Sequence, residues 1–151
     1  MRDTRHTMKS IAGILIVASL LVTDLAVADS ADIAGTWLSG DGDGLIAVEV
    51  SGNTLRATIL GSAREDPERA TTDVHNPDPA LRDRPLVGLE LFSGFKYDGD
   101  GAWSGGFIYD PNSGNTYRCK IKLLDPDTLK VRGFIGVALF GRTETWTRRP
   151  D

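Results

Sequence analysis

YRCKIKL, residues 117–123, places an apolar side chain at every second position and a basic one at each position between. Strict alternation of this kind is typical of a strand with one face on a core and the other in water. The segments DPNSG at 110–114 and DPD at 125–127 flank it, and Gly, Pro, Asp and Asn favour tight turns. The last third of the chain is therefore predicted to be a meander of antiparallel strands.

The rest of the chain extends this pattern. The predicted strands are residues 35–38, 45–50, 55–60, 86–95, 103–109, 116–124, 129–135 and 141–149. About eight strands without a long helical pattern indicate an all-β fold, a small antiparallel up-and-down barrel that leaves no sheet edge exposed. A sandwich of two sheets is the main alternative.

Residues 62–85 interrupt the strands with a polar, proline-containing segment. It is too long for an ordinary connection, and Asp78 followed by Pro79 predicts the cap and first turn of a short helix. This loop is either a lid or binding element, or a solvated crossover between hairpins.

The N-terminus has the features of a targeting segment. Basic residues precede an apolar run at residues 11–22, and small residues at 26–28 form a cleavage site. The run is shorter than the roughly 20 residues of a spanning helix. We expect a signal peptide at 1–28, a single domain at 29–151, a periplasmic or secreted location and no stable membrane insertion.

The composition argues against some classes of partner and excludes an internal disulfide. The chain has a net charge of −4 with its Lys and Arg scattered along the strands, so nucleic acid and anionic membrane surfaces are not expected partners. Cys119 is the single cysteine, so no internal disulfide is possible. We expect Cys119 to be a small buried apolar residue rather than a reactive thiol.

The inward faces of the strands supply the candidate ligand site. Alternation places Trp103, Phe107 and Tyr109 on one face of their strand. In an eight-stranded barrel, inward side chains either fill the core or line a pocket. The candidate barrel lining is Leu89, Leu91, Trp103, Phe107, Tyr109, Tyr117, Cys119, Arg142 and Trp146.

The last strand leaves its register open. If Trp146 faces inward, Arg142 is a buried cation paired with Glu144 or with an acidic ligand group. If the threonine face is inward, Arg142 and Glu144 form an ordinary surface pair. The inward Trp face is favoured because Trp146 gains from burial.

The first and last strands become neighbours when a meander closes. Trp37 then meets the last strand, and Arg148 over its indole gains about 0.5–2 kcal/mol of cation–π energy. This Gly-x-Trp near the start with an Arg near the end resembles the lipocalin (calycin) signature.

Catalytic and metal sites are not expected. His75 lies in the polar loop without a nucleophile-elbow sequence or a set of zinc ligands. The repeats DGDG at 41–44 and 98–101 lack the rest of a calcium loop and match hairpin turns better. Plentiful carboxylates single out no pair for glycoside hydrolysis, so the sequence predicts no enzyme, no metal and no cofactor.

A wider resemblance covers nearly the whole mature chain. It rests on NPDP at 76–79, GGFIYDP at 105–111, TYRC at 116–119, LKVRG at 129–133 and GRT at 141–143, in this order. These pieces resemble an exported bacterial domain-of-unknown-function family with a lipocalin-like barrel. The resemblance implies a barrel that holds a small apolar ligand and implies no catalytic residues. The alternative is a filled barrel that binds a protein or envelope partner through its loops.

Overall fold

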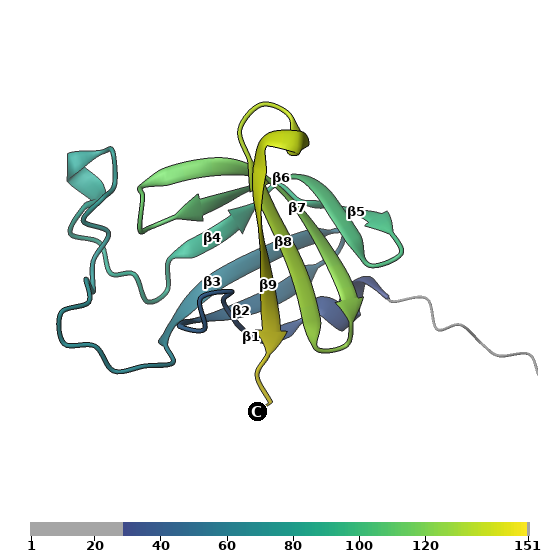
Figure 1. The fold of residues 1–151 in the computed structure, drawn as a ribbon, viewed down its shortest axis with the longest axis horizontal. Coiled ribbons are helices and arrows are strands. Elements are labelled where there is room, and N and C mark those ends of the chain that lie inside the picture. The colour runs from purple at the N-terminus through teal and green to yellow at the C-terminus, as the bar shows by residue number, and fades with distance from the viewer. Residues whose placement is uncertain (1–28, 151) are drawn as a thin grey trace, which may run out of the picture.

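An antiparallel sheet that closes on itself makes up most of the structure (Figure 1). The computed structural model describes residues 29–150, so the predicted signal peptide lies outside the described residues. The strands are β1 (Gly35–Leu38), β2 (Gly44–Ser51), β3 (Thr54–Ser62), β4 (Glu90–Ser93), β5 (Lys96–Gly99), β6 (Ala102–Asp110), β7 (Asn115–Asp125), β8 (Thr128–Phe134) and β9 (Gly141–Arg148). Three short 3-10 helices accompany them, η1 (Ser30–Ile33), η2 (Pro79–Leu81) and η3 (Ala138–Phe140).

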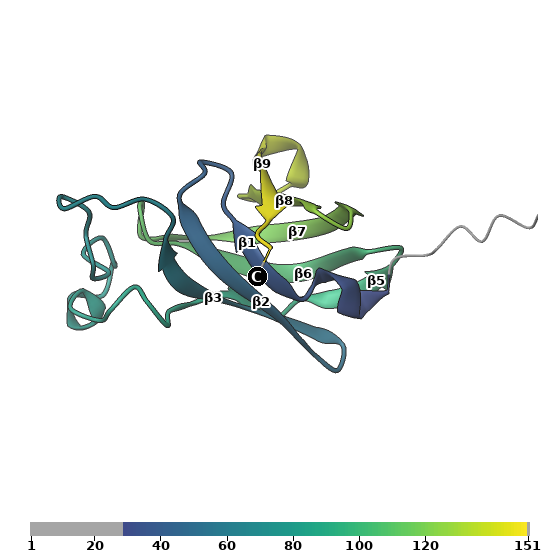
Figure 2. The same ribbon diagram turned by 90° about the horizontal axis from the view of Figure 1, so that it is seen from below.

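The strand order establishes a closed barrel. The strands follow the order β4-β3-β2-β1-β9-β8-β7-β6, and β4 pairs with β6 to close the circle. β5 also pairs with β6, so β4 and β5 are successive parts of one bent strand. The result is an eight-stranded antiparallel barrel, which confirms the predicted fold and excludes the sandwich (Figure 2). The second DGDG segment, residues 98–101, forms the predicted hairpin turn only in part, because β5 continues to Gly99.

Trp37 and Arg148 join the first and last strands, as predicted. They are paired residues of β1 and β9, and the Arg148 guanidinium lies 4.3 Å from the indole centroid. Arg148 also donates hydrogen bonds to the carbonyls of Asp32, Ala34 and Pro126, at 2.6–2.7 Å. The Arg148 side chain thus holds η1, the β7–β8 turn and the start of β1 together at one end of the barrel, here called the closed end.

β6 contains a bulge that the alternation did not predict. Trp103 pairs with Ile121 and Gly106 pairs with Cys119, so β6 has one more residue than β7 between these two pairs. Gly105 has φ +77°, a conformation that glycine adopts without steric cost. An extra residue reverses the inward and outward positions beyond it.

The bulge therefore reverses the second half of β6. Ile108 pairs with Tyr117 and packs against the core, whereas Phe107 is 43% exposed on the outer face. Tyr109 follows Phe107 to the outer side, where it meets the loop between β3 and β4. The prediction that Phe107 and Tyr109 share the inward face of Trp103 was wrong for this reason.

The closed half of the barrel is solidly packed. Large apolar side chains from most strands are buried there, including all three tryptophans, Phe92 and Phe95. Phe92 stacks on Trp146 with centroids 5.6 Å apart and planes at 13°. Such close-packed aromatic groups contribute substantially to stability.

The connection between β3 and β4, here called the long loop (residues 63–89), carries the predicted short helix. Asp78 caps η2 by accepting a hydrogen bond from the Ala80 amide at 2.9 Å. Within residues 29–150, no helix has the length and apolar character needed to cross a membrane.

Candidate functional site

A cavity of about 1060 Å³ occupies the open half of the barrel and extends beneath the long loop. Its apolar walls come from strands on opposite sides of the barrel and from the long loop. These residues are Ile46, Ile59, Val74, Leu86, Val87, Leu91, Ile108, Tyr117, Val131 and Trp146. The volume lies just above the range of roughly 300–1,000 Å³ that is usual for small-molecule pockets. The barrel interior is thus filled at one end and hollow at the other.

Trp146 lies at the boundary between the two halves. It lines the cavity while Phe92, stacked against it, lies in the packed core. Its indole Nε1 donates to Glu144 at 3.3 Å. The bottom of the cavity is therefore a broad aromatic surface with one satisfied polar atom.

Charged side chains surround the mouth of the cavity. The charged residues among its lining are Asp41, Asp43, Asp66, Glu68, Arg69, Asp110, Arg142 and Glu144. Two basic groups stand among six carboxylates, so the rim is acidic. An acidic rim disfavours a ligand with an exposed anionic end.

The long loop is held by a buried network centred on Asp73. This carboxylate is fully buried and accepts hydrogen bonds from Tyr109 Oη at 2.6 Å and Asn76 Nδ2 at 2.7 Å. Arg84 donates to it through Nε at 2.9 Å and approaches it through a second guanidinium nitrogen at 2.7 Å. Every buried polar side-chain atom in the described part of the chain has a partner, so this network is fully satisfied.

The network perturbs the acid–base behaviour of its members. Burial raises the pKa of Asp73, but hydrogen bonds from Tyr109, Asn76 and Arg84 outweigh it and bring the pKa below its ordinary value. Burial, followed by its bond to the Asp73 carboxylate, raises the pKa of Tyr109. Asp73 is therefore ionised and Tyr109 protonated at neutral pH.

A second anchor holds the beginning of the loop. Asp43 accepts a hydrogen bond from Ser62 Oγ at 2.7 Å and forms an ion pair with Arg69. Ser62 first, and then Arg69, lower the pKa of Asp43. The first DGDG segment is thus a turn that binds the loop, and Asp41 within it accepts from the Asp43 amide at 3.1 Å.

The turn between β6 and β7 provides a third contact. A Cβ on Gly114 would lie 1.9 Å from the carbonyl oxygen of His75, and Gly114 has φ +71°. Only glycine permits this close approach of two backbones. The exposed side of His75 borders the cavity.

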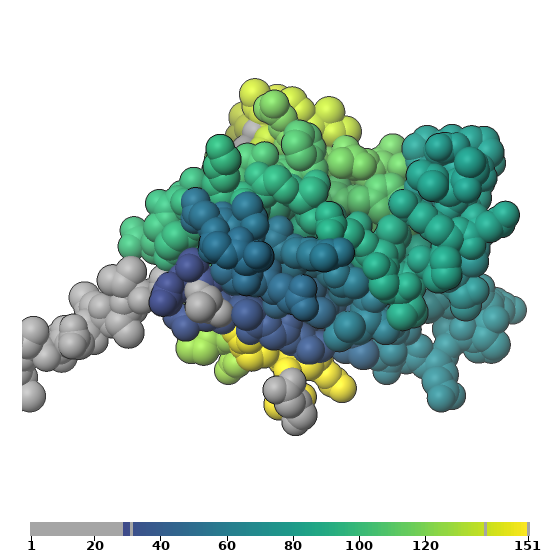
Figure 3. All heavy atoms as spheres, turned by 180° about the vertical axis from the view of Figure 1, so that it is seen from behind, coloured from purple at the N-terminus to yellow at the C-terminus, as the bar shows by residue number. Residues whose placement is uncertain are grey.

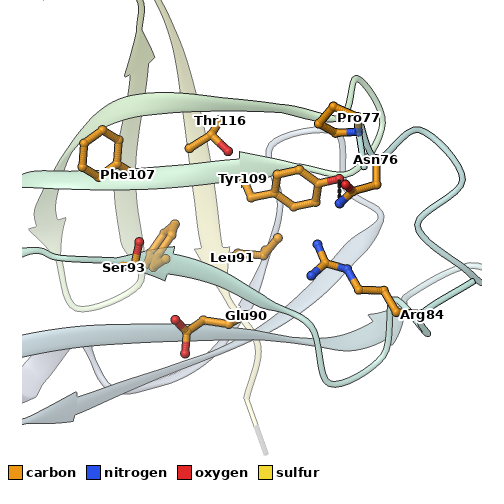
Figure 4. Close-up of a pocket in the computed structure, with 11 residues that line it drawn as sticks. Asn76, Pro77, Arg84, Glu90, Leu91, Ser93, Phe107, Tyr109 and Thr116 are labelled. Atoms are coloured by element: carbon orange, nitrogen blue, oxygen red, sulfur yellow. Dashed lines mark hydrogen bonds between the residues drawn. The ribbon is translucent and has the colours of Figure 1, made fainter. Parts of the chain in front are cut away.

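A smaller groove of about 320 Å³ lies under the loop. Figure 4 shows Arg84 extended toward the Tyr109 ring, with Phe107 and Thr116 further along the same groove. The Arg84 guanidinium carbon lies 5.5 Å from the Tyr109 centroid. This groove is therefore occupied in part by the contacts that hold the loop.

The structure separates the predicted lining residues into groups. Leu91, Tyr109, Tyr117, Arg142 and Trp146 line the large cavity. Trp103 and Cys119 face inward but lie in the packed core instead. Leu89 precedes β4 and Phe107 faces outward, so neither lines it.

The register of β9 agrees with the favoured interpretation. Trp146 pairs with Leu129 and Glu144 with Val131, and both partners are buried core residues. Arg142 shares this inward face but stands at the mouth, where its side chain is 85% exposed and lies 3.4 Å from Glu144. The expectation of a buried Arg142 cation was wrong, because β9 begins at the open rim and Arg142 is its second residue.

Cys119 is the small buried residue that the sequence predicts. Its side chain is 1% exposed, and burial raises the pKa of the thiol to about 12. Among residues 29–150, no group of three or more His, Cys, Asp or Glu residues is placed to hold a metal ion.

Sequence reasoning missed the role of Asp73. In the sequence, Asp73 is one acid among many in a polar loop. Its contact with Tyr109 can be inferred only once Tyr109 is known to face outward. Asn76 lies in a piece of the family pattern, NPDP at 76–79, but the pattern does not reveal its contacts.

Comparison with known proteins assigns the family. The model of an uncharacterized protein conserved in bacteria (DUF2147) matches residues 35–148. The chain belongs to this DUF2147 family. The match confirms the resemblance drawn from the sequence.

A solved structure has the same fold. It is described as protein HP1028 from the human pathogen Helicobacter pylori, which belongs to the lipocalin family. The likeness has a TM-score of 0.70 at 22% identity, over 78% of this chain and 83% of that chain. This DUF2147 member therefore has a lipocalin-like barrel. A comparison with curated proteins finds no match.

Proposed function

We propose that this protein is an exported lipocalin-like barrel that binds one small, mostly apolar molecule. The carrying observation is the cavity of about 1060 Å³, with an aromatic base and a loop that forms one of its walls. Concave, mostly apolar sites with a few polar groups are the common form of small-molecule pockets. The signal-like N-terminus supports a periplasmic or secreted location.

The charge around the mouth limits the ligand. Arg142 is exposed and already near Glu144, and most other rim charges are acidic. A neutral molecule, or one whose polar end is not anionic, suits such a rim better than a fatty-acid-like carboxylate. The apolar part is expected to contact Trp146 and Ile108.

Binding accounts for the perturbed groups better than catalysis does. Asp73, Tyr109 and Asp43 have shifted pKa values, and each is engaged in holding the long loop. Structural networks shift pKa values as active sites do. The supported role is therefore a carrier or receptor rather than an enzyme.

The alternative is a protein- or envelope-binding module. Its premise of a filled barrel disagrees with the open cavity. It predicts an exposed apolar patch on residues 62–85 or at the strand ends, and the exposed apolar side chains of the loop between β8 and β9 support it.

Native mass spectrometry of the protein recovered from its own host tests the proposal. We expect a species with one additional small molecule that is lost on collisional activation and extractable into organic solvent. Recovery of only the bare chain, together with no uptake of any apolar probe, would contradict it.

A further inference from the structure

The loop between β8 and β9, here called the apolar tip (residues 135–140), exposes an unusual concentration of large apolar side chains. They are Ile135 (74% exposed), Val137 (58%), Leu139 (80%) and Phe140 (76%). The tip rises from the body in Figure 1 and forms a knob at the top of Figure 3. Single exposed apolar residues are ordinary, but contiguous groups mark interaction sites.

The tip has defined backbone contacts that present these side chains outward. Arg132 donates to the Leu139 carbonyl at 3.2 Å and to Thr143 Oγ1 at 2.6 Å. The Phe140 amide donates to the Val137 carbonyl at 3.1 Å and closes the turn of η3. The exposure of the tip therefore belongs to an ordered conformation.

A strip of cations, here called the basic face, continues directly from the tip. It consists of the outward residues Arg118, Lys120 and Lys122 of β7 and Lys130 and Arg132 of β8. Residues 115–124 and 128–134 contain no acidic residue. The outward residues of the neighbouring β9 are Thr143, Thr145 and Thr147, so that strand supplies no compensating carboxylate.

The register sets like charges directly opposite each other. Lys120 pairs with Arg132, and Lys122 with Lys130. Like charges in opposed positions destabilise a sheet, although Lys122 Nζ finds some compensation at the Asp100 carbonyl. An anionic partner would relieve this repulsion between the opposed cations, so the surface is suited to one.

Tip and basic face are continuous. Arg118 pairs with Phe134, the residue before the tip, and Lys122 lies four residues further along β7. At about 3.3 Å per residue the cations extend over roughly 13 Å. The sequence suggested scattered charges, but strand pairing gathers five cations beside four exposed apolar side chains.

We propose that the apolar tip and basic face dock the protein on an anionic phospholipid surface. Lys and Arg are attracted to the headgroups while apolar side chains enter the boundary between headgroups and acyl chains. Nucleic acid would engage the cations but leave the tip unused. The acidic loops at residues 41–43 and 66–68 belong to the β1–β2 and β3–β4 connections and would be repelled from the same surface, which orients the molecule.

Vesicle flotation tests docking. The protein is recovered after export and its N-terminus is read by mass spectrometry, so that all variants have the same ends. Vesicles of phosphatidylcholine alone are compared with equal mixtures of phosphatidylcholine and phosphatidylglycerol. We expect binding to the mixture that weakens as salt is added.

Two double variants separate the contributions. Lys120→Gln with Lys130→Gln should weaken binding to the anionic vesicles about 30-fold, since each cation near such a surface contributes about fivefold. Leu139→Ser with Phe140→Ser should reduce binding by more than about tenfold. Both should leave uptake of the neutral probe N-phenylnaphthylamine unchanged, which distinguishes failure of docking from failure of the ligand site.

Matched controls remove equivalent side chains elsewhere. Arg56→Gln with Arg149→Gln removes two cations that lie outside the basic face. Leu60→Ser with Leu124→Ser removes two exposed apolar side chains that lie outside the apolar tip. These variants should bind like the unaltered protein. Absence of vesicle binding, equal effects of controls and test variants, or capture of a protein partner without lipid binding would overturn the proposal.

Discussion

At the scale of single residues, Asp73 is the group on which the long loop depends. A buried carboxylate that loses its charge-assisted hydrogen bonds leaves its former donors unsatisfied. Here those donors come from the loop itself and from Tyr109 of β6. One side chain thereby connects the loop to the barrel wall.

Replacing Asp73 with Asn should lower the free energy of unfolding by about 1–3 kcal/mol, because hydrogen bonds to a charged group are weakened. Chemical denaturation measures the change. Asp78→Asn is the matched control, since Asp78 is exposed and Asn caps helices equally well. Equal stability of the two variants would argue against the network.

The same residue predicts a pH dependence. Because the pKa of Asp73 is lowered in the folded state, its contribution is complete above the unfolded pKa of about 3.9 and is lost as the pH falls through the folded value. The pKa of Tyr109 is raised, so its contribution is lost only as the pH rises above about 10. The loop should stay anchored between these limits.

Nuclear magnetic resonance checks this window through the side-chain amide of Asn76, which bonds to Asp73 at 2.7 Å. Its nitrogen shift should stay constant across neutral pH and move only below about pH 4 and above about pH 10. A transition near pH 6 would contradict the assignment. The Asp73→Asn variant should lack the acid transition.

At the scale of elements, the contact between the long loop and the β6–β7 turn depends on one backbone approach. Gly114→Ala should detach the loop near His75, because the added Cβ would lie 1.9 Å from a carbonyl oxygen. We expect a loss of about 1–3 kcal/mol, as for overpacking elsewhere. Hydrogen exchange of residues 72–86 should accelerate.

Gly136→Ala is the control for this substitution. Gly136 has φ +73°, nearly equal to that of Gly114, but nothing lies within 4 Å of its added Cβ. It therefore carries the same backbone strain without the clash. If both variants behave alike, backbone strain alone explains the effect and the close approach does not matter.

The elements also show what sequence predicts and what it does not. Alternation predicted strands β2 and β3 and the inward face of β7, where Tyr117, Cys119 and Ile121 follow a period of two. It failed in β6 because the bulge at Gly105 is a backbone conformation, and one extra residue reverses every later side chain. The Trp37–Arg148 contact was predictable because a closed meander makes its end strands neighbours.

The Asp73 network, in contrast, could not be predicted from alternation or from strand order. Its members come from residues 73–84 and from β6, and no local pattern relates them. Long-range polar contacts of this kind follow from the tertiary structure, so they appear only once the loop is placed.

At the scale of the whole molecule, the barrel combines a packed closed half with a hollow open half. Arg148 and the aromatic core stabilise the first, and the anchored loop forms a wall of the second. The division means that the cavity does not have to be filled for the fold to be stable. Stability and ligand binding are thus expected to respond to different substitutions.

The central claim is that an apolar ligand occupies the cavity inside this barrel. Ile108 and Phe107 are neighbours on β6, with Ile108 lining the cavity and Phe107 facing outward. The decisive measurement is the affinity for N-phenylnaphthylamine, followed by its fluorescence, in Ile108→Trp and Phe107→Trp. Ile108→Trp should bind about tenfold or more weakly because the ring fills the cavity, a loss of about 1.4 kcal/mol, and Phe107→Trp should bind normally. Equal affinities in two variants of unchanged stability would contradict the account.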